Sequence, residues 1–323
     1  MVLPVSVRAK HSLRTPADQG GRSKEMQADT HLRLMGYGWA LLSAALWSTI
    51  GPMSKLCQME GLPPLDIAFW RALLGGLCFA AQSACQRQLR LPFSHALLFM
   101  LFGIVGVGAF FSVLQVAILK SGAAVSMVLM YTAPIWVALF ARVLFQEPVT
   151  RHKLAGVLVA LAGTGMVCMA GGSLPAAFSA LGILCGLASG FCYALHFPFF
   201  VWWKSRYSTA VIYTYMLLGG ALALAPCVSG AGSYTPVVWL NILGLGVVTN
   251  YLAYYAYGQC LRCIPQVSAA VIGNVEPLLA TFWVWQFWGE NFTPLGWAGS
   301  ACILAAVLCI TLEPRSVPPA SAG

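Results

Sequence analysis

The chain has 323 residues, of which 59% are hydrophobic and 8% are charged. A soluble domain normally carries about 25% charged residues, so this chain is too poor in polar groups to cover a water-exposed surface. Lipid must therefore be its main solvent, which excludes an ordinary soluble enzyme. The net charge of +9 comes from basic residues gathered between apolar segments. That pattern is typical of membrane topology and not of a nucleic-acid interface, so no nucleic acid is expected as a partner.

Apolar segments follow one another along most of the chain, and each is close to the roughly 20 residues that one transmembrane helix needs. Their connections are short and leave no room for a soluble domain. The predicted spans are 36–56, 67–86, 97–118, 123–144, 153–171, 179–203, 208–229, 237–259, 267–288 and 295–312. We therefore expect an all-α membrane protein with ten transmembrane helices.

The two ends of the chain are polar. Residues 1–34 are basic and contain no apolar run long enough for a signal peptide, so they are expected to form a disordered cytoplasmic tail. Residues 314–323 form a second tail. When the N-terminus is placed inside, most basic residues of the connections, such as Arg87 and Arg151, also fall inside. This bias predicts a multi-pass protein of the plasma or inner membrane with both termini in the cytoplasm.

The two halves of the apolar region resemble each other. Matching positions lie 142 or 143 residues apart, and they pair Lys120 with Arg262, Val125-Ser126 with Val267-Ser268, Pro134 with Pro277, and Glu147 with Glu290. We assign residues 35–171 and 172–313 to two repeats of five helices. Because five is odd, the second repeat is inverted in the membrane relative to the first. Inverted repeats are typical of carriers that work by alternating access. Because one chain holds both repeats, a monomer is sufficient for this mechanism, and a homodimer is the alternative.

Several short motifs occur in a fixed order along these helices. They are Trp47 with Lys55, Phe69-Trp70-Arg71, Thr132-Ala133-Pro134 with Gln146-Glu147, and Glu276-Pro277 with Gly289-Glu290. Over residues 36–312 the chain resembles the EamA-type branch of the drug/metabolite transporter superfamily. The resemblance implies two inverted five-helix repeats around a central cavity lined mainly by helices 1, 3, 4, 6, 8 and 9. It also implies export or uptake of amino acids, other metabolites or drugs, commonly coupled to protons or to exchange.

Glu276 is the strongest candidate for a coupling residue. It lies near the middle of the ninth predicted helix, where a carboxylate is costly and should face a cavity or a partner. Pro277 removes a backbone hydrogen bond beside it, and the equivalent Pro134 marks the corresponding helix of the first repeat. We expect Glu276 to bind a proton or substrate and the two prolines to act as hinges. The alternative for Glu276 is a neutral acid that bonds a neighbouring helix.

Three basic side chains lie within or beside the predicted helices. His196 titrates near neutral pH and could relay protons, although a buried histidine bonded to a backbone carbonyl is the alternative. Lys55 could hold an anionic substrate at the outer mouth or extend toward the membrane surface. For Arg71, near the outer end of the second helix, we expect a structural role, and binding of an anionic substrate is the alternative.

Polar and aromatic residues could line a pocket for an organic solute. Asn250 and Tyr254 share one face of the eighth predicted helix. With Trp47 and Tyr131 they are candidates for substrate binding, and Asn274 is a weaker one. Helix packing and an interfacial aromatic belt are the alternative.

The predicted function is secondary transport of a small organic solute, with export favoured and with coupling to protons or exchange. The sequence has no P-loop, HExxH or GxSxG motif, so neither ATP-driven transport nor an intramembrane enzyme is favoured. An intramembrane enzyme and a membrane scaffold remain the alternatives. Cys260 and Cys263 form an isolated CxxC without a second pair, so we expect no metal and no cofactor.

Overall fold

A computed structural model describes residues 16–170, 179–232, 234–289 and 293–312. Within these residues the secondary structure is helical throughout, and nine helices are long and apolar enough to cross a membrane. The first predicted helix is not one of the nine. The prediction of an all-α membrane protein is therefore confirmed, while the count of ten helices stays a prediction.

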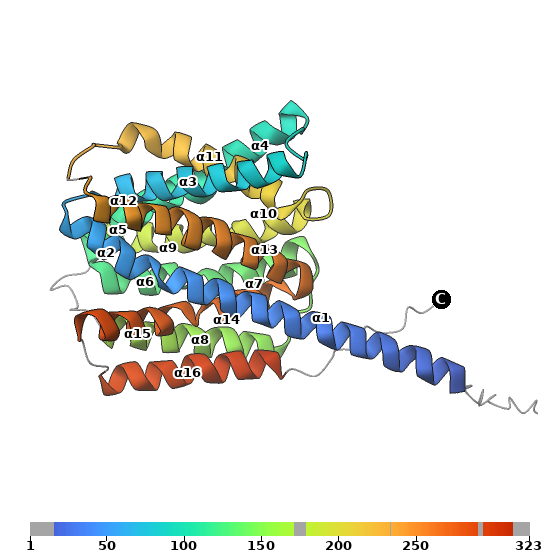
Figure 1. The fold of residues 1–323 in the computed structure, drawn as a ribbon. Helices are drawn as coiled ribbons and strands as arrows, with labels where there is room; N and C mark the ends of the chain where they lie inside the picture. The colour runs from blue at the N-terminus through green and yellow to red at the C-terminus, as the bar shows by residue number, and fades with distance from the viewer. Residues whose placement is uncertain (1–15, 171–178, 233, 290–292, 313–323) are drawn as a thin grey trace, which may run out of the picture.

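The helices form one bundle whose axes run roughly side by side (Figure 1). In chain order they are α1 (Pro16–Ser48), α2 (Ile50–Met59), α3 (Pro64–Cys85), α4 (Phe93–Gly103), the π-helix η1 (Ile104–Ala109), α5 (Phe110–Ser121), α6 (Ala123–Met130), α7 (Ala133–Leu144), α8 (Arg151–Ala170), α9 (Ala180–Ala194), α10 (His196–Trp203), α11 (Thr209–Leu224), the 3-10 turn η2 (Ala225–Cys227), α12 (Pro236–Gly244), the π-helix η3 (Leu245–Leu252), α13 (Ala253–Cys263), α14 (Gln266–Gly273), α15 (Glu276–Trp288) and α16 (Pro294–Thr311).

The first helix starts earlier than the sequence suggested. Residues 16–34 were expected to belong to a disordered tail, but α1 begins at Pro16 and continues to Ser48. A helix that is already nucleated in the membrane extends at little cost, because only the first turn is expensive to form. The polar part of α1 projects beyond the rest of the bundle (Figure 1). Residues 1–15 and 313–323, where the rest of the two tails was expected, lie outside the described residues.

Four of the predicted transmembrane helices are broken within the described part of the chain, and each break precedes a proline by three residues. The breaks fall at Thr49, Tyr131, Leu195 and Asn274, before Pro52, Pro134, Pro198 and Pro277. Proline has no N–H group and its ring clashes with the carbonyl one turn earlier, so the helix cannot continue regularly through that turn. Pro134 and Pro277 are the two hinges predicted from the sequence, and Pro52 and Pro198 occupy the same position relative to a break without having been predicted.

The third and eighth predicted helices are continuous but widen into π-helical turns. The segment η1 occupies residues Ile104–Ala109 and η3 occupies Leu245–Leu252. These two segments lie about one repeat length apart, so they match each other in the two halves. Single π turns inside α-helices are often found at functional sites. Both helices contact the central cavity described below.

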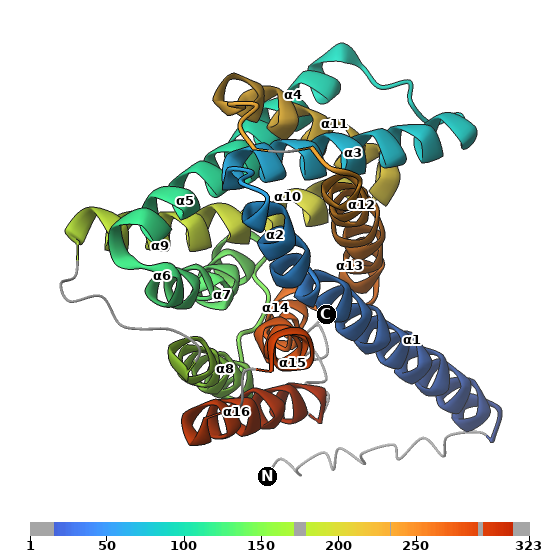
Figure 2. The same cartoon turned by 60° about the vertical axis from the view of Figure 1, so that its left-hand side comes forward.

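The packing of the helices follows the inverted repeat. The helices α3 and α11 match each other in the two repeats and pack together, as do α8 and α16 (Figure 2). Asp66 at the start of α3 accepts hydrogen bonds from the backbone N–H groups of Ser229 and Gly230, just after α11, at 3.1 and 3.0 Å. The start of one helix thus meets the end of its equivalent, so the two helices run in opposite directions.

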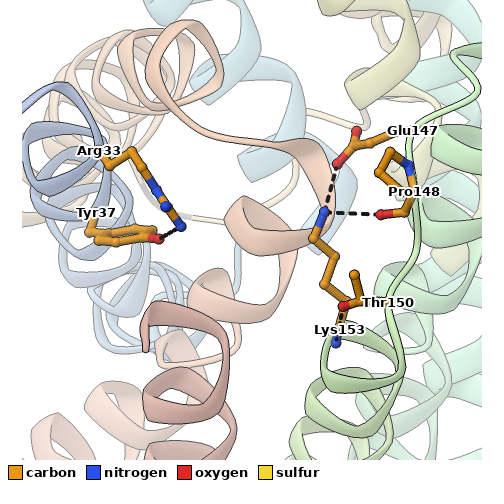
Figure 3. Close-up of polar contacts among 6 residues, drawn as sticks. All are labelled: Arg33, Tyr37, Glu147, Pro148, Thr150 and Lys153. Carbon is orange, nitrogen blue, oxygen red and sulfur yellow. Dashed lines mark hydrogen bonds and ion pairs between the residues drawn. The ribbon is translucent and has the colours of Figure 1, made fainter. Parts of the chain in front are cut away.

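An ion pair stabilises the connection between α7 and α8 (Figure 3). Lys153 Nζ lies 3.3 Å from a Glu147 carboxylate oxygen and donates to the Pro148 carbonyl at 3.2 Å. The Thr150 hydroxyl caps α8 by accepting from the Lys153 N–H at 3.2 Å. Near the polar part of α1, Arg33 donates to the Tyr37 hydroxyl at 3.0 Å. Glu147 therefore fixes a connection between helices, and its repeat equivalent Glu290 lies outside the described residues.

Candidate functional site

A cavity of about 480 Å³ lies in the centre of the bundle. Its lining runs from Lys55 and Pro64, where α2 and α3 meet at one end of the bundle, to Glu276 at the break between α14 and α15. Most of the lining is apolar or aromatic. The charged residues among the lining are Lys55, Arg71 and Glu276. Such a cavity, apolar with few polar groups, is typical of a binding site for a small organic molecule.

Glu276 is the first residue of α15 and directly precedes Pro277. The N-terminal end of a helix stabilises negative charge, so the break provides a favourable place for a carboxylate inside the bundle. Tyr131, at the equivalent break between α6 and α7, lines the same cavity and interacts with the Glu276 carboxylate. The charge of Arg71 also acts on the Glu276 carboxylate. The two broken helices therefore meet at the inner end of the cavity.

Arg71 lines the same cavity, although its side chain is only 7% exposed. Its Nε and Nη2 atoms donate to Asn250 Oδ1 at 3.1 and 3.0 Å, and Asn250 Nδ2 donates to the Arg71 carbonyl at 2.9 Å. The guanidinium carbon lies 5.0 Å from the centre of the Phe111 ring. We refer to these reciprocal bonds as the Arg71–Asn250 clamp. It fixes the orientation of a positive charge at the cavity wall.

The clamp depends on a glycine in α3. A Cβ atom at Gly75 would lie 2.6 Å from Asn250 Cβ, closer than real Cβ contacts allow. Glycine thus lets η3 approach α3 closely enough for Asn250 to reach Arg71. The π-helical turn of η3 contains Asn250, so local backbone geometry and close packing together position this side chain.

Aromatic rings form much of the remaining wall. Trp47 packs edge-on against Tyr254, with ring centres 5.3 Å apart, and Tyr193 lines the cavity beside them. The Trp47 Nε1–H group donates to the Thr249 carbonyl in η3 at 3.0 Å. Trp47, Tyr131 and Tyr254 therefore lie together at the cavity, as the sequence analysis expected of residues that could line a pocket.

His196 lies behind this wall and is not among the residues that line the cavity. Its side chain is 4% exposed, and its Nε2 atom is 2.7 Å from the Gly106 carbonyl in η1. The ring stacks near Tyr254 with centres 6.1 Å apart. This is the arrangement that the sequence analysis gave as the alternative to proton relay.

Two side chains tie the halves of the protein together in a matching way. Trp47, just before the break at Thr49, holds a carbonyl of η3, and His196, just after the break at Leu195, holds a carbonyl of η1. A π turn disrupts the regular α-helical bonding pattern, and side chains of neighbouring helices can satisfy carbonyl groups that this leaves available. These two broken helices are therefore each bonded to the widened helix of the opposite repeat.

The side of Glu276 away from the cavity mouth is tightly packed. A space of only about 10 Å³ remains there, bordered by Ala133, Phe197 and Tyr257. Asn274 borders it too, is 3% exposed, and its Nδ2 atom has no hydrogen-bond partner in the described part of the chain. The cavity thus reaches Glu276 from the Lys55 end, whereas the other end is filled by side chains.

A helical bundle of two matching halves around a central cavity, open at one end and packed at the other, defines a membrane transporter for a small solute. A sequence model of the EamA-like transporter family matches the chain twice, over residues 34–169 and 180–312. The chain belongs to this family, and the resemblance stated from its motifs is confirmed.

Similar proteins agree with this assignment. The uncharacterized transporter YdfC of Bacillus subtilis is 25% identical over 84% of this chain and 88% of its own length. The S-adenosylmethionine/S-adenosylhomocysteine transporter of Chlamydia trachomatis serovar L2 is 25% identical over 78% of this chain and 82% of its own. A solved crystal structure with 20% identity superimposes with a TM-score of 0.73, covering 87% of this chain and 96% of that one, which supports the fold.

Proposed function

We propose that this protein is a secondary transporter that moves a small organic solute through the central cavity by alternating access, with Glu276 as the coupling residue. The observation that carries the proposal is one cavity, mainly aromatic and apolar, that is lined by Glu276 and by Arg71, whose guanidinium is held from behind by Asn250. A carboxylate that can be reached from one end only is suited to bind a proton or a cationic group on one side and release it on the other.

The charges of the cavity favour a solute that carries a carboxylate, such as an amino acid. Asn250 occupies the Nε edge of the Arg71 guanidinium, so Nη1 remains to donate to a solute anion. Glu276 could accept an ammonium group of the same molecule, while the rings of Trp47 and Tyr254 pack against an apolar side chain. Lys55 near the mouth would attract the anion as it enters.

The four prolines at the helix breaks are proposed as the hinges. They form two matching pairs, Pro52 with Pro198 and Pro134 with Pro277, so both repeats can change shape in the same way. With both termini in the cytoplasm, as the distribution of basic residues indicates, the present cavity opens to the outside. In export, the solute would leave from this state.

The test is uptake by proteoliposomes of labelled amino acids, organic acids and amines, with and without an imposed pH gradient. Wild type is compared with Glu276→Gln and with Glu60→Gln, which removes an exposed carboxylate outside the cavity. We expect gradient-driven movement of one solute class, lost in Glu276→Gln and kept in Glu60→Gln. Gradient-driven movement that survives in Glu276→Gln would contradict the role of Glu276. A folded protein that moves no solute would contradict the proposed substrate class.

A further inference from the structure

A second, polar hollow lies at the end of the bundle opposite the mouth of the central cavity. Its volume is about 360 Å³. It is bordered by the last turn of α3, the connection from α10 to α11, the start of α11 and the last turns of α13. In Figure 1 these helix ends lie toward the right-hand side of the bundle. The side chains of Gln82, Gln86 and Gln259 add amide groups to its lining.

The charge of this hollow is positive. Lys204, Arg206 and Arg262 line it, and none of its lining residues is acidic. Glu147, which does not line the hollow, interacts electrostatically with Lys204. However, Glu147 forms an ion pair with Lys153 at 3.3 Å. The three cations therefore share a polar space without a carboxylate in its wall to balance them.

Two of these cations are held in place by backbone carbonyls. Arg262 donates from Nη1 to the Lys204 carbonyl at 2.7 Å and from Nη2 to the Tyr207 carbonyl at 3.0 Å. Lys204 Nζ donates to the Leu261 carbonyl. An ammonium group has three N–H donors and each terminal guanidinium nitrogen has two, so both side chains retain donors for a ligand. The carbonyl bonds orient the side chains without neutralising their charge.

The start of α11 adds backbone donors to the same space. Thr209 and Ala210, its first two residues, line the hollow, and the first N–H groups of an α-helix have no acceptor within the helix. The Ser208 hydroxyl accepts from the Val211 N–H at 3.4 Å and so satisfies a later one. The helix N-terminus carries partial positive charge, which adds to that of the three side chains.

The surroundings of Lys204 also favour a nearby negative charge. Burial, and then the nearby charge of Arg262, lower the pKa of Lys204. A bound anion would offset the repulsion between these two cations and favour the charged ammonium group. The same anion would accept hydrogen bonds from those N–H groups of Lys204 and Arg262 that do not bond backbone carbonyls.

We propose that this hollow is a binding site for a phosphate group. Its donors come from two well-oriented cations, a third cation on the surrounding connection, a helix N-terminus and amide side chains, which together suit an anion with several acceptor oxygens. Such a group could belong to the headgroup of an anionic phospholipid at the membrane surface or to free phosphate in the water. The site is separate from the central cavity and does not depend on the proposed transport function.

The experiment measures thermal stability of the purified full-length protein in detergent during titration with three probes. The probes are dioctanoyl phosphatidylglycerol, dioctanoyl phosphatidylcholine and inorganic phosphate, because a ligand that binds the folded state raises the unfolding temperature. Wild type is compared with Lys204→Gln and Arg206→Gln. The matched control is Arg90→Gln, which removes an exposed charge from the neighbouring connection after α3 and does not line the hollow.

We expect saturable stabilisation of wild type and about tenfold weaker apparent binding in each of the two variants, as for the loss of one charge-assisted hydrogen bond. Arg90→Gln should bind as wild type. Phosphatidylglycerol alone would identify a lipid headgroup, whereas inorganic phosphate would identify a soluble source. The proposal is overturned when no probe stabilises the protein, when phosphatidylcholine acts as well as phosphatidylglycerol, or when all variants respond alike. If Lys204→Gln does not fold, Arg206→Gln decides.

Discussion

Replacing Asn250 by aspartate tests whether Arg71 binds the anionic group of the solute. The substitution keeps the shape of the side chain and leaves an oxygen to accept from Arg71 Nε and Nη2, which now bond Asn250 Oδ1 at 3.1 and 3.0 Å. It removes the amide that donates to the Arg71 carbonyl at 2.9 Å. More importantly, it places a negative charge beside the guanidinium. That charge offsets the positive charge of Arg71 to which the solute anion would bind.

The size of the effect follows from Coulomb's law. A solute carboxylate on the free edge of Arg71 would lie about 7 Å from the new carboxylate, and at an effective dielectric constant of about 20 the repulsion is about 2.4 kcal/mol. This corresponds to roughly 50-fold weaker binding of the anion. A solute without a carboxylate would not experience this loss.

The assay is proteoliposome transport of the solute that wild type moves, with KM determined for wild type and for Asn250→Asp. Thermal unfolding in detergent and gel filtration establish that the variant folds. We expect KM to rise by roughly 50-fold for a carboxylate-bearing solute and to change little for its neutral amide analogue. An unchanged KM for the acid in a folded variant would refute the idea that Arg71 binds the solute anion.

Three further predictions address packing, the bonds between the repeats, and orientation. Gly75→Ala places a methyl group against Asn250 and should lower the free energy of unfolding by about 1–3 kcal/mol, and an unchanged denaturation midpoint in detergent would contradict the close approach of η3 to α3. Trp47→Phe keeps an aromatic ring but removes the N–H donor to η3. The free energy of unfolding should therefore fall by about 1 kcal/mol, and amide hydrogen exchange in η3 should accelerate. Unchanged exchange would argue against that bond. The exposed cysteines Cys227 and Cys85 lie at opposite ends of the bundle. In variants that retain only one of them, an impermeant maleimide should label Cys227 in intact cells and Cys85 only after permeabilisation. The reverse labelling pattern would show that the proposed orientation is wrong.

Much of the fold follows from the sequence because the membrane restricts the choices. Apolar runs of bilayer length must be helical, since backbone groups in lipid must be bonded within the same segment. The predicted segments accordingly lie on helices of the structure, although α1 begins earlier and four segments are broken. Glu276 was recognisable as a costly charge in one of them. The four helix breaks were also readable, because each lies three residues before a proline. Pro52 and Pro198 carry the same signal as Pro134 and Pro277, from which hinges were predicted.

The grouping of residues into a site was decided by the tertiary structure. Arg71 and Asn250 are 179 residues apart, and no local pattern shows that Gly75 lets them meet, so a structural role for Arg71 was the natural expectation. His196 has the side chain of a proton relay, yet packing places its ring against the Gly106 carbonyl, and it is not among the residues that line the cavity. Residue type and helical position determine which groups are costly to bury in the membrane. Which of them face a common space depends on how helices far apart in the chain pack, and that information is spread over many small contacts that a single sequence does not display.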